Sequence, residues 1–214
     1  INKAAIANIE VTAPSVTYDT NAHGVTSIKV DNVEIIGDTT KYEVTYYEAV
    51  KETVEGKEVY KKATGENGEE LPALEGAPTD AGTYLAEVTV KGDNDHADTT
   101  VEAGYVINKA TVVMTGVQYE IVDNEGTVYT NPAEVVYEAG KTYSIQVVAS
   151  TKPEEVASIS YEGNGKEAAG KYNVTVKFVL ADSKNYEAIA DVVKELNINK
   201  AAIANIEVTA PSVT

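Results

Sequence analysis

The sequence contains no cysteine and no arginine, so all seventeen of its basic residues are lysine. The absence of cysteine excludes disulfides, thiolate metal sites and a cysteine nucleophile. Positive charge is also scarce, because 34 acidic residues leave a net charge of −17. Nucleic acids and anionic lipid headgroups both select positive surfaces, so we expect neither as a partner. We interpret the acidity as a property of an exposed surface that keeps the chain in solution.

Long hydrophobic runs are absent as well. No stretch approaches the ~18 apolar residues that span a membrane, so we expect no membrane insertion. No signal peptide is visible, and a chain that starts within a repeat would not show one.

The strongest internal signal is an exact recurrence. The segment Ile1–Thr17, INKAAIANIEVTAPSVT, returns without change at Ile198–Thr214, and a shorter copy, INKA, lies at Ile107–Ala110. Blocks of about 100 residues have the size of small domains. We therefore predict two tandem domains, residues 1–108 and 109–199, with residues 200–214 forming the first strand of an incomplete further repeat. The period of 197 residues leads us to expect a longer array.

Residue usage predicts the fold class, all-β. Val, Thr, Tyr and Ile are frequent, Gly, Asn, Asp and Pro separate the runs that they form, and helical periodicity is scarce. In the first block we expect strands at residues 6–11, 25–36, 41–50, 57–63, 83–90 and 99–107, with turns at residues 31–32, 55–56 and 67–68 and a loop over 64–80. In the second block we expect strands at residues 111–122, 126–129, 133–137, 142–149, 156–161, 171–180 and 188–198, and one helical turn within 152–157. Six or seven short strands per block are typical of a β-sandwich.

A local motif makes the sandwich prediction more specific. Asp80-Ala-Gly82-Thr-Tyr84 matches the immunoglobulin pattern D-x-G-x-Y, in which the tyrosine hydroxyl bonds backbone at a strand corner. The second block keeps Gly170 and Tyr172 but has alanine in place of the aspartate. Our structural site candidates are Asp80, Gly82, Tyr84, Gly170 and Tyr172. We expect both tyrosines to be buried with their hydroxyls bonded to backbone.

Together with the Tyr42–Tyr46 strand and the closing INKA, these motifs resemble the bacterial Ig-like repeats of the MBG type, within Pro78–Val90 and Gly170–Val176. Such repeats occur in tandem in large surface proteins, mainly of Gram-positive bacteria. The resemblance implies two tandem Ig-like sandwiches in an extracellular, cell-wall-associated adhesin or fibre stalk. It supplies no catalytic or ligand-binding residues.

Candidate binding residues are few. Asp93, Asp95 and Asp98 have a spacing that suits Ca²⁺, but the loop lacks the Gly and Glu positions of an EF-hand, so we favour a solvated hairpin turn. Gly163-Asn-Gly165 imitates a nucleotide-binding loop, but a strand follows where a helix should begin, so we predict a turn. Lys29 and Lys177 alternate with outward positions along their strands, so we expect neither lysine to be buried. This argues against isopeptide cross-links, which form beside a buried carboxylate.

We therefore expect a non-enzymatic stalk segment without cofactor, whose partners are neighbouring repeats of the same chain. Two alternatives remain open at this stage: a module that binds host glycan or protein, and a filament subunit that pairs strands between chains. We also expect residues beyond about Ala202 to be disordered in an isolated chain, because their sandwich partner is missing.

Overall fold

The computed structural model describes residues 2–129 and 134–203. Contacts divide the chain into two compact units. Unit 1 comprises Ile1–Thr111 together with Asp182–Glu187, and unit 2 comprises Val112–Ala181 and Ala188–Thr214. Strands dominate both units, and the helical structure in the described ranges is one short 3₁₀ turn, so the predicted all-β class is confirmed.

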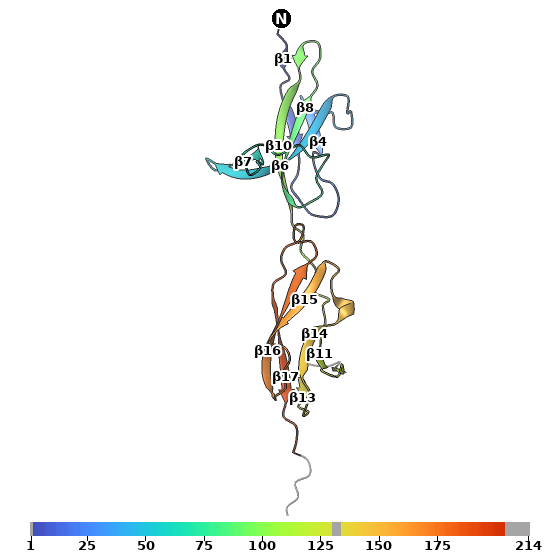
Figure 1. Cartoon of the computed structure of the whole chain (residues 1–214). Helices are drawn as coiled ribbons and strands as arrows, with labels where there is room; N and C mark the ends of the chain where they lie inside the picture. The colour runs from blue at the N-terminus through green and yellow to red at the C-terminus, as the bar shows by residue number, and fades with distance from the viewer. Residues whose placement is uncertain (1, 130–133, 204–214) are drawn as a thin grey trace, which may run out of the picture. The chain divides into compact units, whose positions relative to one another are not determined.

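From Asn2 onward, unit 1 is built from three sheets, of which two hold the core. The larger has the strand order β3-β10-β8-β6-β7, a smaller one has β2-β4-β5, and β1 pairs with β9 in parallel. In Figure 1, β8 and β10 run side by side along the length of this unit. The bounds are β1 Ala4–Ala5, β2 Ile9–Thr12, β3 Val16–Thr17, β4 Ser27–Val30, β5 Val33–Glu34, β6 Tyr42–Val54, β7 Lys57–Lys62, β8 Gly82–Val90, β9 His96–Ala97 and β10 Thr99–Asn108.

The core of unit 1 follows from the alternation along its central strands. On β8 the side chains of Tyr84, Ala86, Val88 and Val90 are all buried, at every second position. Successive strand residues point to opposite faces, so one apolar face of β8 lies on the core. Ile28 of β4 is fully buried and packs in the same cluster as Val88. The two main sheets therefore enclose a shared hydrophobic layer, as in a β-sandwich.

The far half of β6 pairs with β7 in a hairpin that leaves the body of unit 1, as Figure 1 shows. Its turn has positive φ at Glu55 and Gly56, which is the hairpin turn that the sequence predicts. The base of the hairpin is held by Tyr60, whose ring lies against Gly104 of β10 so closely that any Cβ there would overlap it. A glycine inside a strand often marks such a close approach.

In its described residues, unit 2 has two sheets. The strand orders are β12-β11-β14 and β13-β17-β16-β15. Tyr143, Ile145, Val174 and Leu196 lie in the core between them and are almost fully buried. The bounds are β11 Tyr119–Asp123, β12 Val128–Tyr129, β13 Glu134–Val136, β14 Tyr143–Val147, η1 Ala149–Thr151, β15 Val156–Glu162, β16 Gly170–Leu180 and β17 Val192–Asn199.

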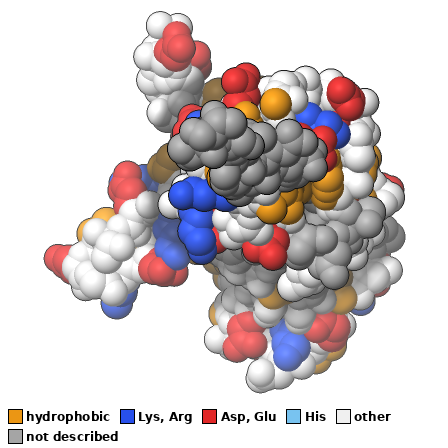
Figure 2. All heavy atoms as spheres, turned by 90° about the horizontal axis from the view of Figure 1, so that it is seen from below, with side chains coloured by type: hydrophobic (Ala, Val, Ile, Leu, Met, Phe, Trp, Pro, Cys, Tyr) orange, Lys and Arg blue, Asp and Glu red, His pale blue; other side chains and the backbone are white. Residues whose placement is uncertain are grey.

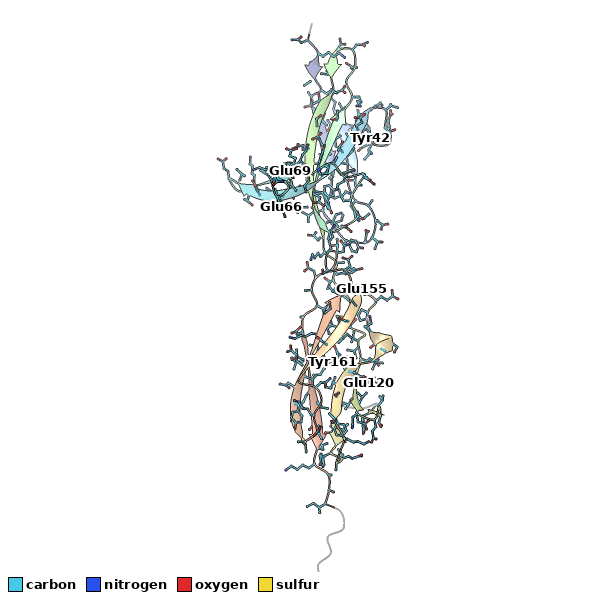
Figure 3. All side chains as sticks on the ribbon, viewed as in Figure 1. Tyr42, Glu66, Glu69, Glu120, Glu155 and Tyr161 are labelled. Carbon is cyan, nitrogen blue, oxygen red and sulfur yellow. The ribbon has the colours of Figure 1, made fainter. Side chains whose placement is uncertain are left out.

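Tyrosine hydroxyls tie the elements of each unit together. In unit 2, Tyr161 of β15 reaches across to β14, where its hydroxyl accepts the Val147 N–H at 2.9 Å (Figure 3). In unit 1, the fully buried Tyr105 donates to His23 O at 2.9 Å. A buried tyrosine needs such a partner for its hydroxyl. Several of the fourteen tyrosines thus fill the cores and also fix the connections between strands.

The structure corrects several predicted elements. The strand expected at residues 111–122 begins only at Tyr119, because a turn in which Val117 N–H donates to Met114 O intervenes. The strand expected at 6–11 begins only at Ile9, in β2, because Asn8 has φ 54° and leaves the extended conformation. The helical turn expected within 152–157 lies earlier, in η1.

The turn predicted at Asn67-Gly68 is present, but its geometry is not that of a two-residue type I′ turn. Only Gly68 has positive φ, whereas a type I′ turn needs positive φ at both central positions. Gly68 N–H donates to Gly65 O at 3.0 Å, so residues 65–68 form a β-turn whose last residue, Gly68, adopts the left-handed conformation. The turn expected at Asp31-Asn32 is confirmed, and both of its residues have positive φ.

Candidate functional site

The corner of unit 1, which we define as Asp80–Tyr84, has the predicted hydrogen bond. The Tyr84 hydroxyl donates to Asp80 O at 2.8 Å, and the Tyr84 side chain is buried. A Cβ on Gly82 would lie 2.8 Å from the Tyr84 hydroxyl oxygen, so any other residue there would push the tyrosine out of its present position. The tyrosine therefore closes the five-residue segment Asp80–Tyr84 at the start of β8.

The corner of unit 2, Ala168–Tyr172, repeats this geometry. The Tyr172 hydroxyl donates to Ala168 O at 2.9 Å, and a Cβ on Gly170 would lie 3.0 Å from it. Tyr172 is only half-buried, so its predicted hydrogen bond is present but its burial is less than expected. Lys166 lies over its ring, with Nζ 5.4 Å from the centroid.

A polar cluster surrounds Asp80 in unit 1. Lys184 Nζ lies 2.6 Å from Asp80 Oδ2, and Asn185 Nδ2 donates to Asp80 Oδ1 at 3.0 Å. Asn185 Oδ1 in turn accepts the Ala81 N–H at 2.6 Å. The hydrogen bond from the Lys184 ammonium, followed by that from Asn185, holds the pKa of Asp80 below its usual value.

The burial of these groups indicates which contact matters most. Asn185 is 5% exposed, whereas the side chains of Asp80 and Lys184 are 43% and 59% exposed. An exposed ion pair contributes little to stability, but a buried amide is costly unless its polar atoms are bonded. Asn185 is therefore the anchor of this cluster. Sequence reasoning missed it, because 104 residues separate it from Ala81.

The loop that carries Asn185, which we call the 182–187 loop, also binds the INKA segment at Ile107–Ala110. Ala110 N–H donates to Asn185 O at 2.9 Å, and Glu187 N–H donates to Ala110 O at 2.8 Å. Lys109 Nζ donates to Ser183 O at 2.7 Å. These bonds place the loop within unit 1, although it lies between β16 and β17 in the sequence.

The first INKA segment makes the same set of contacts with a different loop, Asp93–Asp98, which we call the 93–98 loop. Lys3 Nζ donates to Asp93 O at 2.6 Å, and Ala4 N–H donates to Asp95 O at 3.0 Å. Ala4 pairs in parallel with His96, as Ala110 does with Tyr186. The two INKA segments thus share one mode of binding, in which lysine and alanine attach to a loop backbone.

The 93–98 loop contains the calcium candidates Asp93, Asp95 and Asp98. Asp93 Oδ1 accepts the backbone N–H groups of Asp95 and His96, both at 2.8 Å, and these bonds lower its pKa to about 2. Asp98 Oδ1 accepts the Gly92 N–H at 2.9 Å. In residues 2–129 and 134–203, no group of three or more acidic or histidine side chains is arranged to hold a metal ion. The carboxylates of Asp93 and Asp98 stabilise the turn itself.

The most enclosed carboxylate of the described chain is Asp123 in unit 2, which the sequence did not single out. Its side chain is fully buried and accepts from Lys141 Nζ at 2.8 Å and from the Tyr129 hydroxyl at 3.0 Å. Backbone N–H groups of Glu125 and Thr127 donate to its other oxygen. The Lys141 ammonium is the main reason that the pKa of Asp123 is held far below its usual value. Two of the four donors lie in the loop between β11 and β12, one is in β12, and Lys141 precedes β14 by two residues, so their bonds to Asp123 fix the conformation of that loop.

The surface carries charge of both signs. On the face that Figure 2 shows, acidic side chains and lysines are interspersed among uncharged ones. On the hairpin of unit 1, lysines pair with glutamates across the strands, as in Lys51–Glu58 at 2.5 Å and Lys61–Glu52 at 2.6 Å. Within the described ranges, no helix is long and apolar enough to cross a membrane.

Comparison with known proteins adds no family assignment. No model of a protein family matches this sequence, and no curated protein matches it significantly.

Proposed function

We propose that this chain is a stalk segment of a repetitive bacterial surface protein, which projects a binding region away from the cell wall. In this proposal the segment is extracellular and has no enzymatic activity, and its repeats are of the Ig-like MBG type. Its direct partners are the neighbouring repeats of the same polypeptide.

The observation that carries the proposal is the recurrence of one joining element. The same INKA sequence appears three times, and in the two cases where a loop binds it, lysine and alanine make equivalent backbone hydrogen bonds. A polypeptide that repeats its joining segment with so little change is typical of an extended array. A binding protein with one ligand site has no such need for identical joints.

The charged groups support a structural role. The buried carboxylate of Asp123 uses both oxygens for hydrogen bonds that fix a turn. The ion pairs along the β6–β7 hairpin place charges on an edge strand, which is how natural sheets discourage pairing with other chains. This feature disfavours a filament formed through β7.

Cell-surface localisation provides the first test. An antiserum against the whole chain should label intact cells of the bacterium that carries the gene, and brief protease treatment of intact cells should remove the signal. In-frame removal of one 197-residue period should shorten the surface projection without altering the rest of the protein. Labelling that appears only after lysis would refute the surface role.

An array of glycans and host proteins, probed with the whole chain, distinguishes the stalk function from the alternative of a binding module. We expect no saturable binding. Saturable binding that a single loop variant abolishes would replace the stalk proposal with the binding alternative.

A further inference from the structure

One complete joint is present in unit 1 and serves as the template. Strand β10 ends at Asn108, the next two residues are Lys109 and Ala110, and the 182–187 loop binds these two residues and the Asp80 corner at once. The ring of Tyr18 completes this joint, since it packs edge-on against Tyr186 with 5.5 Å between centroids.

Each half of a second such joint is present, but on separate parts of the chain. The 93–98 loop already binds Lys3 and Ala4. Those two residues have identical counterparts in Lys200 and Ala201, which follow β17 directly. In a continuing array, Lys200 and Ala201 of one period would occupy the place of Lys3 and Ala4 on the next.

The end of unit 2 matches the end of unit 1 residue by residue. Strand β13 pairs with β17 in parallel, with Val136 opposite Asn199, as Thr17 lies opposite Asn108 in β3 and β10. Tyr137 N–H donates to Asn199 O at 2.9 Å, the equivalent of the Tyr18 N–H bond to Asn108 O at 2.8 Å. Tyr137 therefore stands where Tyr18 stands in the complete joint.

Unlike Tyr18, Tyr137 is 38% exposed, and together with Lys141, Glu167 and Ala168 it lines a shallow hollow at the corner of unit 2. In unit 1 the equivalent position beside the corner is filled by the 182–187 loop. The hollow thus has the geometry of a joint whose loop is supplied from elsewhere.

We propose that the Ala168–Tyr172 corner, with Tyr137, is a docking site for the 93–98 loop of a second copy of this period. The inference rests on the proposed array. By the correspondence of backbone contacts, Asp95 takes the place of Asn185 and accepts the Ala169 N–H, while His96 takes the place of Tyr186 and packs on Tyr137.

The side chains at the two joints then specify the order of the blocks. The corner that carries Asp80 meets a loop with Lys184 and an uncharged amide, whereas the corner that carries Ala168 meets a loop with Asp95. If the 93–98 loop docked at the first corner instead, its Asp95 carboxylate would face the Asp80 carboxylate across the 3.0 Å now spanned by the Asn185 bond. Like charges at a contact oppose wrong pairings. The two blocks therefore alternate.

Disulfide trapping tests the proposal, because the natural chain has no cysteine. The probe is a chain of two consecutive periods, with Ala168→Cys in the first and Asn94→Cys in the second, since Asn94 corresponds to Lys184. A matched control places the second cysteine at Glu66, in the loop beside the β6–β7 hairpin (Figure 3). Under mild oxidation we expect the Asn94 pair to close at least about tenfold faster than the control pair, because docking raises the local concentration.

A change of charge at the corner provides the second readout. In a two-period chain with Glu167→Cys in the first copy and Asn94→Cys in the second, Ala168→Asp in the first copy should slow closure about tenfold, and Asp95→Asn in the second copy should restore it. Equal rates for the docking and control pairs would overturn the docking site. A rate of disulfide formation that Ala168→Asp leaves unchanged would overturn the ordering rule. Neither result bears on cell-surface labelling, so this inference and the proposed function fail separately.

Discussion

The corner tyrosines provide the sharpest stability prediction, because two nearly identical hydrogen bonds differ mainly in burial. Tyr84→Phe removes a hydroxyl that donates to Asp80 O at 2.8 Å, and Tyr172→Phe removes one that donates to Ala168 O at 2.9 Å. The Tyr84 side chain is 4% exposed, whereas Tyr172 is half-buried and Ala168 is exposed. The second carbonyl can therefore turn to water when its donor is lost.

The magnitude follows from that difference. A typical net hydrogen bond contributes about 1 kcal/mol, and a buried acceptor left without a partner costs about 1–3 kcal/mol. Tyr84 and Asp80 line one shallow pocket of unit 1, which admits some water to the freed carbonyl. We therefore expect Tyr84→Phe to destabilise unit 1 by about 1 kcal/mol, and Tyr172→Phe to destabilise unit 2 by less than about 0.5 kcal/mol.

Native-state amide exchange in the whole chain measures both effects without assuming a single unfolding transition. Amides of β8 and β10 report on unit 1, and those of β16 and β17 report on unit 2. A loss of about 1 kcal/mol corresponds to roughly fivefold faster exchange of the globally protected amides. Equal acceleration in the two variants would refute the burial argument. No change in Tyr84→Phe would show that the corner hydrogen bond adds nothing to stability.

Four further predictions concern single features. Gly104→Ala should destabilise unit 1 by about 1–3 kcal/mol in urea denaturation, since its methyl group would overlap the Tyr60 ring, whereas Gly116→Ala, with open space around it, should be near neutral. Asp93 has its pKa lowered to about 2, so its contribution to the stability of the 93–98 loop should be complete above the unfolded pKa near 4 and lost as pH falls toward 2, as exchange of the loop amides would report. Thermal melts with millimolar Ca²⁺ and with chelator should coincide, and a rise of several degrees with Ca²⁺ would restore the metal site. Deletion of Ala202–Thr214 should leave both melting transitions unchanged, and unfolding of unit 2 would contradict the boundary drawn at the INKA segment.

The sequence by itself determined the fold class and the recurring elements. Period-two alternation of apolar residues is a local property of a strand that has one buried face, so strands such as β6, β8 and β16 could be placed from the sequence. The corner hydrogen bonds of Tyr84 and Tyr172 were predictable for the same reason, because donor and acceptor lie four residues apart. The exact return of the INKA segment needs no structure at all. The predicted disorder beyond Ala202 concerns residues 204–214, which lie outside the described part of the chain.

Tertiary structure decided everything that depends on distant partners. Asn185 reaches Ala81 across 104 positions, and Lys141 reaches the buried Asp123 across 18, so no local pattern indicates either contact. The residues before Tyr119 have strand-like composition but lie largely outside any sheet, because a strand forms only where a neighbour supplies its hydrogen bonds. The grouping of the 182–187 loop with unit 1 has the same origin, since its polar atoms find their partners there.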